Sequence, residues 1–273
     1  MTLFSSVLTA IVPILITLAL FGAGSIIERL APAEPDQPEG NISLNIGYAI
    51  LAGALAAAVS PALAVVSTSL VNGLGGGLIA LPARGWLLVL SAAAYLLAVD
   101  FLEFAFHCAQ HRIPVLWAMH SFHHSDPSVN VTTTSRNFWL EMLIKGGFVY
   151  PLAAILFKVP RPVLFIYSLS TVWHYVNHLN CRWHLPLPWW LINNSSFHRI
   201  HHSVLPEHYD RNFSAYFPIW DVIFGTSIAP TRGVHPKTGL DTGEAPKGVV
   251  AAFIWPWRDG VHALLPSWRS PRP

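Results

Sequence analysis

The stretch "WLLVLSAAAYLLAVDFLEFAFHCAQHR" (residues 86–112) decides the fold, because it joins a membrane-spanning pattern to a metal-binding one. Its first part is almost entirely apolar, and about 20 apolar residues suffice for a helix to cross a bilayer. Its last third carries Asp100, Glu103, His107 and His111, whose spacing puts them on one stripe of a helix. We therefore expect one long helix that crosses the membrane and projects beyond it.

The composition also indicates a membrane protein. The 273-residue chain is 53% hydrophobic and only 11% charged, whereas soluble domains average about 25% charged residues. Its net charge of +2 is too small for a nucleic-acid-binding footprint. Two cysteines, Cys108 and Cys181, suggest neither a disulfide framework nor a C-x-x-C metal motif. The unusual residue is histidine, present 14 times, and imidazole is the commonest metal ligand.

Further apolar runs complete the membrane part. Residues 3–27 predict an uncleaved transmembrane helix rather than a signal peptide, since no positive charge precedes them and the run is too long. Residues 46–71 predict a second span, in which Pro61 allows a kink. Residues 137–157 and 162–180 predict a helical hairpin, because the link between them is very short. The count is four spans, or five if the hairpin crosses fully.

The rest of the chain is more polar and is expected to form a mainly helical cap over residues 193–273. Residues 185–192, "LPLPWWLI", are typical of the membrane interface, where tryptophan concentrates. The predicted fold class is an all-α membrane protein whose cytoplasmic helical cap holds a histidine-rich dimetal site. Residues 1–85 would form the N-terminal transmembrane helices, and residues 86–273 the catalytic domain.

The distribution of Lys and Arg predicts the orientation. Nine of the 16 basic residues lie from Arg182 onward, and Arg112 and Arg136 flank the second histidine motif. Because cytoplasmic segments carry an excess of Lys and Arg, the histidines and the C-terminal part are expected on the cytoplasmic side.

Four histidine motifs carry the chemistry: "HCAQH" (107–111), "HSFHH" (120–124), "HYVNH" (174–178) and "FHRIHHS" (197–203). Histidines at i and i+4 share one helix face, so each H-x-x-x-H pair can converge on one metal. In H-x-x-H-H the three rings cover an arc of about 100°, so two can share an ion while the third turns toward a neighbouring one. Ten imidazoles are too many for one centre and predict two metals side by side. The predicted ligands are His107, His111, His120, His123, His124, His174, His178, His198, His201 and His202.

The type of ligand limits which metals are expected at the site. Nitrogen-rich sites suit iron, zinc, copper and nickel, and the absence of H-E-x-x-H argues against a zinc protease. Two irons would suit the reduction of dioxygen and attack on a lipid C–H bond. Ligand histidines usually donate their second ring nitrogen to a carboxylate or carbonyl. Asp100 is therefore the candidate catalytic residue, as a carboxylate that orients a ligand ring, and Asp210 is a second candidate for that role.

At these residues the chain resembles the fatty acid hydroxylase/sterol desaturase superfamily of membrane di-iron enzymes, over about residues 95–228. The resemblance rests on the four motifs in order, with "PVLWAMHSFHHS" (114–125), "TSRNFWLE" (134–141), "DRNF" (210–213) and "IWDVIFGTS" (219–227). It implies metal roles for the ten histidines and a pair of iron ions, which zinc can replace in purified protein. It also implies oxygen-dependent hydroxylation or desaturation of a lipid or sterol-like substrate. Without a fused heme segment, it implies a separate electron-donor protein.

The chain departs from the family pattern at two positions. Cys108 follows His107 where the family often has arginine, and Ser214 stands where glycine is common. Neither change removes a ligand, but both leave the local geometry open.

Other residues have ordinary interpretations. His208, outside the motif spacing, is expected to be a satisfied polar residue, and Asp221 a turn or cap residue. Arg136 and Glu141 are expected to form a structural ion pair. The alternative function is a membrane metal-binding or transport protein without oxidative catalysis. Ligands that cluster beyond the apolar runs, and the lack of repeated halves, argue against a transporter.

Overall fold

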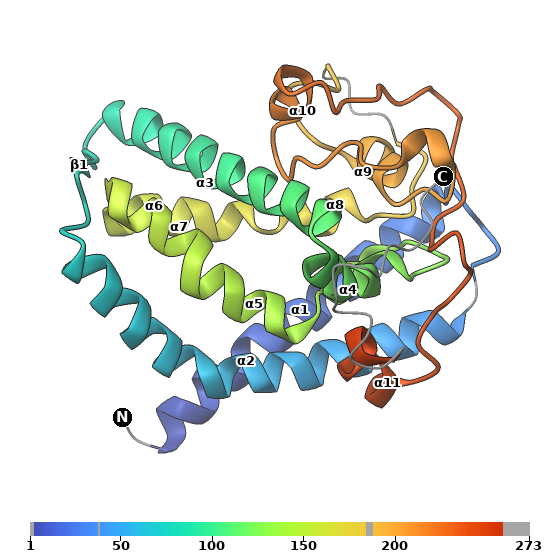
Figure 1. Cartoon of the computed structure of the whole chain (residues 1–273), viewed down its shortest axis with the longest axis horizontal. Helices are drawn as coiled ribbons and strands as arrows, with labels where there is room; N and C mark the ends of the chain where they lie inside the picture. The colour runs from blue at the N-terminus through green and yellow to red at the C-terminus, as the bar shows by residue number, and fades with distance from the viewer. Residues whose placement is uncertain (1–2, 38, 184–187, 259–273) are drawn as a thin grey trace.

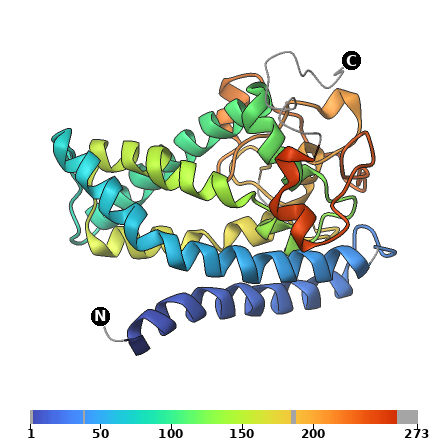
Figure 2. The same ribbon diagram turned by 60° about the horizontal axis from the view of Figure 1, so that its bottom comes forward.

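The computed structural model describes residues 3–37, 39–183 and 188–258, and it is mostly helical (Figure 1). Helices α1 (Leu3–Leu30) and α2 (Glu39–Gly73) lie side by side and antiparallel (Figure 2). These two helices confirm the first two apolar runs as helices. α2 continues through Pro61, and Figure 1 shows its second half inclined to its first, as expected where a proline lacks the N–H for the helical ladder.

Helix α3 (Leu87–Arg112) confirms the long helix expected from the opening stretch, and α4 (Pro114–His124) follows it at once. The break is at Ile113, whose backbone is extended because it precedes a proline. Pro114 then begins α4, where its missing N–H costs nothing. This tight turn lays the second histidine motif against the first.

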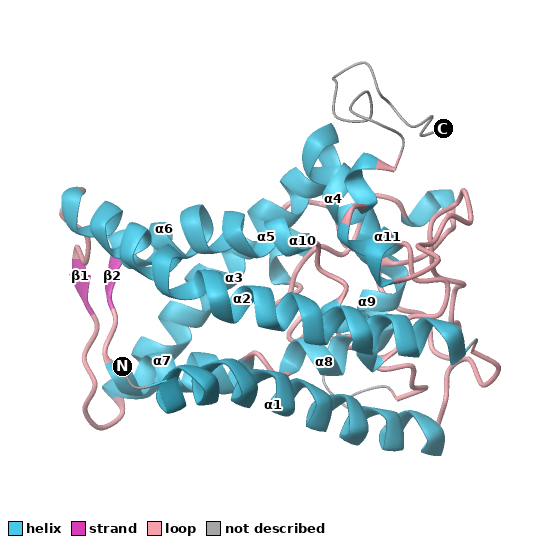
Figure 3. Cartoon of the chain, turned by 90° about the horizontal axis from the view of Figure 1, so that it is seen from below, coloured by secondary structure: helices cyan, strands magenta, loops and turns pink. Residues whose placement is uncertain are grey.

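The predicted hairpin is present, but its helices are interrupted. Its outgoing arm comprises α5 (Trp139–Ile144), a π-helical turn η2 (Lys145–Val149) and α6 (Tyr150–Leu156). Its return arm comprises the short helices α7 (Arg161–Ser170) and α8 (Trp173–Asn177). At the turn, strand β2 (Phe157–Lys158) pairs in parallel with β1 (Ile79–Ala80), so the hairpin reaches the same end of the molecule as the α2–α3 connection (Figure 3).

Four helical segments of the described chain are long and apolar enough to cross a membrane: Ile11–Leu30, Asn41–Gly73, Leu87–Arg112 and Trp139–Leu156. The chain is therefore an integral membrane protein by length and composition of its helices. Helices α7 and α8 are each too short to span a bilayer alone.

The cap lies at the end opposite the two strands, and it is helical only in short pieces (Figures 1 and 3). Glycines with positive φ interrupt it, for example Gly225 and Gly233. Its described part, which ends at Arg258, contains α9 (Ser195–His201), η3 (Pro206–His208), α10 (Ile219–Ile223), α11 (Val249–Phe253) and η4 (Trp255–Trp257). Residues 259–273 of the expected cap, and 184–187 of the interfacial stretch, lie outside the described residues.

A buried charge pair joins α2 to the segment after α4. Arg136 Nη1 lies 3.5 Å from Asp126 Oδ2, and neither side chain is exposed. Asn45 of α2 donates to the same Asp126 oxygen at 3.0 Å and accepts from Arg136 at 3.3 Å. The predicted Arg136–Glu141 pair is therefore wrong. Arg136 follows the 3₁₀ turn η1 (Val131–Ser135) and bonds to Asn45 of α2, whereas Glu141 lies in the first turn of α5 and approaches His120.

Replacing Arg136 with methionine should strongly destabilise the fold. The change leaves the Asp126 carboxylate buried without its cation, which costs about 3–5 kcal/mol in comparable sites. Unfolding of the detergent-solubilised protein would measure the loss. Arg258→Met is the matched control, since Arg258 pairs with a half-exposed Glu244 and should cost less than about 1 kcal/mol. If both variants lost the same free energy of unfolding, the buried Arg136–Asp126 pair would not stabilise the fold more than the exposed pair does.

Candidate metal centre

Nine of the ten predicted histidines gather into two adjacent groups. Each histidine contributes one ring nitrogen, and the nitrogens contributed within a group all lie within 4.8 Å of one another. The groups touch where the rings of His124 and His202 stack, with centroids 4.6 Å apart. The first group is His107, His111, His120, His124 and His201, and the second is His123, His178, His198 and His202.

The division follows the helical spacing expected from the motifs. In the second motif His120 and His124 belong to the first group, and His123 turns to the second. In the fourth motif the reverse holds, since His198 and His202 share the second group and His201 turns to the first. Each H-x-x-H-H motif therefore serves both groups. Whether the nitrogens ligate metals stays a prediction.

The third motif is used differently. His178 joins the second group, but His174 joins neither. Helix α8 ends at Asn177, and the His178 ring folds back so that its Nδ1 donates to the His174 carbonyl at 2.8 Å. The His174 ring instead meets the Tyr216 hydroxyl at 3.0 Å through Nε2. The spacing alone could not predict that the helix stops between the two histidines.

Backbone carbonyls of the "DRNF" segment fix two rings of the first group. His107 Nδ1 donates to the Phe213 carbonyl at 2.7 Å, and His201 Nδ1 donates to the Arg211 carbonyl at 2.8 Å. Asp210 and Asn212 have positive φ angles of 57° and 58°, a conformation that Asp and Asn tolerate better than most residues. The alternation of conformations along 210–213 aims every second carbonyl at a ring. Because Nδ1 carries the proton in both rings, Nε2 presents a bare lone pair.

The D-x-N motif is therefore a positioning element. The Asn212 amide nitrogen donates to the Phe197 and Ile228 carbonyls, each at 3.0 Å. Asp221, in the first turn of α10, accepts from the backbone N–H groups of Phe213 and Ser214, both at 2.8 Å, so it anchors this segment instead of serving as the predicted turn or cap residue. Within the described chain, Ser214 is not among the residues with positive φ, so its backbone conformation does not require glycine.

Two carboxylates approach rings of the first group. Asp210 Oδ1 lies 3.3 Å from His111 Nδ1, in agreement with the orienting role expected of Asp210. Glu141 Oε2 lies 3.5 Å from His120 Nδ1 and accepts from Gln110 at 2.7 Å. Sequence reasoning missed Gln110 and Glu141 in this role. Gln110 lies inside the first motif, but Glu141 is on a separate helix and has no spacing signal.

Asp100 makes no hydrogen bond to an imidazole in the part of the chain that the structure describes. Its two carboxylate oxygens accept the backbone N–H groups of Tyr216 and Phe217, at 2.8 and 3.0 Å. Asp100 thus anchors the segment whose Tyr216 hydroxyl meets His174. Asp100 therefore reaches an imidazole only through Tyr216, and that imidazole, His174, belongs to neither group. The catalytic role of Asp100 stays a prediction.

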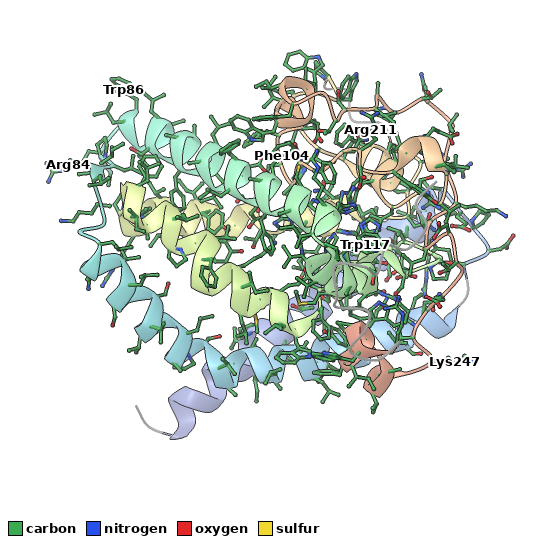
Figure 4. All side chains as sticks on the ribbon, viewed as in Figure 1. Arg84, Trp86, Phe104, Trp117, Arg211 and Lys247 are labelled. Atoms are coloured by element: carbon green, nitrogen blue, oxygen red, sulfur yellow. The ribbon has the colours of Figure 1, made fainter. Side chains whose placement is uncertain are left out.

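Aromatic side chains pack against the histidine groups. Trp117 of α4 lies against His111 and His124, with ring centroids 5.0 and 5.5 Å apart (Figure 4). Phe104 of α3 faces the cap, where it packs with Cys108 and Phe213 (Figure 4). Cys108 is a buried free thiol in this cluster, as is Cys181 elsewhere.

Burial favours the neutral form of several of these imidazoles. It lowers the pKa of His178 to about 4 and the pKa of His201 to about 3. It lowers the pKa of His123, His124 and His202 well below the ordinary value, and neighbouring histidines add to the shift. Neutral imidazole is the form that binds metals.

The donor set fits a pair of metal ions. His178 Nε2 must be bare, because its Nδ1 donates to a carbonyl, yet it faces His123 Nε2 at 3.2 Å and His198 Nε2 at 3.0 Å. In the first group the Nε2 atoms of His124 and His201 are buried without a hydrogen-bond partner in the described structure. Buried nitrogen atoms in this state are costly unless a ligand satisfies them. Nitrogen-rich donors of this kind suit iron or zinc.

A cavity of about 390 Å³ opens beside both groups. Its wall includes His107 and His120 of the first group and His123, His178 and His198 of the second. A smaller cavity of about 60 Å³ touches His111, His124 and His201 near Asp210 and Trp117. His208, in η3, is in neither metal group.

Comparison with known proteins gives one family. The model of the fatty acid hydroxylase family matches residues 92–226. The chain is 34% identical over 142 residues to human alkylglycerol monooxygenase (Homo sapiens), covering 50% of this chain and 31% of that protein. It is 29% identical over 141 residues to a cholesterol 25-hydroxylase-like protein of Danio rerio, covering 49% of this chain and 54% of that protein.

A third relative is a very-long-chain aldehyde decarbonylase of Oryza sativa subsp. indica, 27% identical over 192 residues, which cover 66% of this chain and 30% of that protein. The chain spans less than a third of the length of the alkylglycerol monooxygenases it matches, 29% for the Xenopus tropicalis protein and 31% for the human one. No solved structure matches the chain.

The third motif provides a matched test of the ligand set. His178→Ala should lower the amount of metal bound per chain, because His178 belongs to the second group. His174→Ala should retain the metal content, because that ring bonds to Tyr216 instead. Elemental analysis of the purified variants measures both. Equal loss from the two variants would contradict the assigned grouping.

The metal-free protein should lose stability as the pH falls from 7 to 5. The unfolded chain protonates its histidines near pH 6.5, whereas the folded pKa values of His178 and His201 are about 4 and 3. Between these values the unfolded state binds more protons, so each such ring costs about 2 kcal/mol at pH 5. Thermal unfolding of chelator-treated protein across this pH range measures the effect. An unchanged midpoint would show that the rings are protonated in the folded state.

Proposed function

Because the chain belongs, over residues 92–226, to the fatty acid hydroxylase family, we propose that it is a membrane-bound, oxygen-dependent lipid hydroxylase with two iron ions. The observation that supports this function best is the pair of buried imidazole groups beside one cavity, next to helices of membrane-spanning length. The five rings of the first group would hold one ion, and the four rings of the second group the other. Zinc would occupy the same donors in protein purified without iron.

Bound iron would supply the reduction of dioxygen. The net reaction inserts one oxygen atom into a C–H bond and releases the other as water, and it consumes two electrons and two protons. We assign the electrons to a separate donor protein, and we place the site and the C-terminal part on the cytoplasmic side, as the Lys and Arg distribution predicts.

The protein's own residues hold the geometry for this chemistry. The Phe213 and Arg211 carbonyls keep Nε2 of His107 and His201 deprotonated and aimed inward. Asp210 and Glu141 lie where they can balance part of the charge of bound ions. The cavity leaves one side of each group open to a substrate, and six imidazoles line it, five of them from the two groups. A lipid chain in this cavity would present its C–H bonds directly to the site.

Hydroxylation is favoured over desaturation by the names of the relatives. One is a monooxygenase of alkylglycerols, and another is similar to a sterol hydroxylase. The family model matches residues 92–226, the part of this chain that carries the four histidine motifs, so we transfer the reaction class and leave the relatives' individual substrates to experiment.

Iron-loaded protein in lipid vesicles should consume dioxygen when reductant, donor protein and lipid extract are supplied. The expected product is a lipid heavier by about 16 mass units, or about 18 in ¹⁸O₂, because one atom of dioxygen enters the product. His198→Ala should abolish the product, and His208→Ala should not, since His208 lies outside both groups. Uptake of metal into the vesicles without oxygen consumption would instead support the metal-transport alternative.

A further inference from the structure

The wall of the large cavity holds an ion pair that the histidine site does not use. Lys145 Nζ lies 3.9 Å from Glu103 Oε2, and the Tyr150 hydroxyl donates to Glu103 Oε1 at 3.1 Å. All three residues line the cavity and belong to segments long and apolar enough to cross a membrane. Ionisable side chains at such positions are costly, and they commonly mark a substrate pathway.

The backbone of the outgoing hairpin arm is irregular at this point. Lys145 begins the π-helical turn η2, which interrupts the α-helix between α5 and α6. Such turns frequently occur at functional sites. Gly146, the next residue, lies so close to Leu63 of α2 that a Cβ there would clash with the leucine side chain. Phe148, later in the turn, is 69% exposed, whereas Lys145 lines the cavity.

The ion pair keeps hydrogen-bonding capacity for a ligand. A distance of 3.9 Å is too long for a direct hydrogen bond, so the ammonium and the carboxylate both retain capacity toward the cavity. The Lys145 side chain is 28% exposed. A hydroxyl group placed between them can accept from the ammonium and donate to the carboxylate, because it carries both functions.

Two other residues that line the cavity also favour a ligand that donates hydrogen bonds. Asn177 Oδ1 and Glu141 Oε1 belong to side chains only 2% exposed, and neither atom has a hydrogen-bond partner in the described structure. Both residues line the same cavity. Their free oxygens are acceptors, so they suit ligand hydroxyls and not a second set of acceptors.

The charges of the ion pair favour an uncharged head group over an anionic one. Glu103 and Glu141 line the cavity, and Lys145 is its only Lys or Arg among the described lining residues. Because Glu103 already offsets the charge of Lys145, this ion pair offers no uncompensated cation to a carboxylate or phosphate. A plain hydrocarbon would leave the polar groups buried without partners, which is also costly.

We propose that Glu103, Lys145 and Tyr150 form a head-group subsite for an uncharged, hydroxyl-bearing lipid. The inference rests on the proposed lipid hydroxylase function and names its substrate class. Glu103 and His107 are one turn apart on α3, which corresponds to about 6 Å along the helix axis. A lipid anchored by its hydroxyl at Glu103 therefore presents carbons near its head group, and not the far end of its chain, to the imidazole groups.

Binding measurements test the subsite without turnover. The full-length protein in nanodiscs would be titrated with three ligands of one chain length: an alkane, its primary alcohol and its carboxylic acid. The alcohol should bind at least tenfold more tightly than the other two. The double variant Glu103→Gln/Lys145→Met, which avoids an unpaired buried charge, should remove this preference. Tyr150→Phe should weaken alcohol binding several-fold and leave alkane binding unchanged.

Tyr95→Phe is the matched control. Tyr95 is a buried phenol on α3 that packs behind the cavity wall, against Tyr167, and is not itself among the residues that line the cavity. The metal content of every variant should equal that of the unmodified protein, which separates subsite loss from misfolding. An alcohol preference that survives in both the double variant and Tyr150→Phe would overturn the proposal.

The position of the product oxygen gives a second, independent readout. Fragmentation of the hydroxylated alcohol by tandem mass spectrometry should place the new oxygen within a few carbons of the original hydroxyl. Oxidation at the far end of the chain would overturn the subsite while leaving the hydroxylase function intact. Conversely, alcohol-selective binding without any oxidation would overturn the hydroxylase function and leave the subsite intact.

Discussion

The structure depends on one constraint: many uncharged imidazoles must be held in a buried space with their bare nitrogens facing inward. An isolated imidazole in water is protonated about as often as not near pH 6.5, and its ring turns freely. Burial removes the proton, as the lowered pKa values of His178 and His201 indicate. A hydrogen bond from the other ring nitrogen removes the rotation and fixes the tautomer. For His107, His178 and His201 the acceptor is a backbone carbonyl.

This constraint explains why the cap is built mostly from loops. A regular helix commits its carbonyls to its own ladder, so it can offer few to an imidazole. The segment 210–213 frees them by alternating its backbone conformation at Asp210 and Asn212. Hydrogen bonds between side chains and backbone groups hold this segment in place. The Asn212 amide donates to the Phe197 carbonyl, and the Asp221 carboxylate accepts from the Phe213 N–H. Asp100 supplies a further anchor from α3. The side chains that hold the loop are therefore as necessary to the site as the rings.

The sequence was sufficient for the features that follow from local periodicity. Helix α3, the first two helices and the split of each H-x-x-H-H motif between two groups could all be predicted, because apolar length and the 3.6-residue repeat determine them. The features that depend on where a helix stops could not. His174 would face His178 on a continuous helix, but α8 ends at Asn177 and the two rings separate. Arg136 was expected beside Glu141, but it lies before the start of α5 and pairs with Asp126.

Hydrogen-bond partners that are distant in the sequence could not be predicted either. Asp100 was expected beside an imidazole because it shares a stripe with His107 and His111, yet the cap segment Tyr216–Phe217 occupies that position. The same stripe shows how one helix can serve three purposes in succession. Asp100 holds the cap, Glu103 faces the cavity with Lys145, and His107 and His111 face the first group. A polar residue on each turn thus converts a membrane-spanning helix into the common wall of the cap, the cavity and the candidate metal centre.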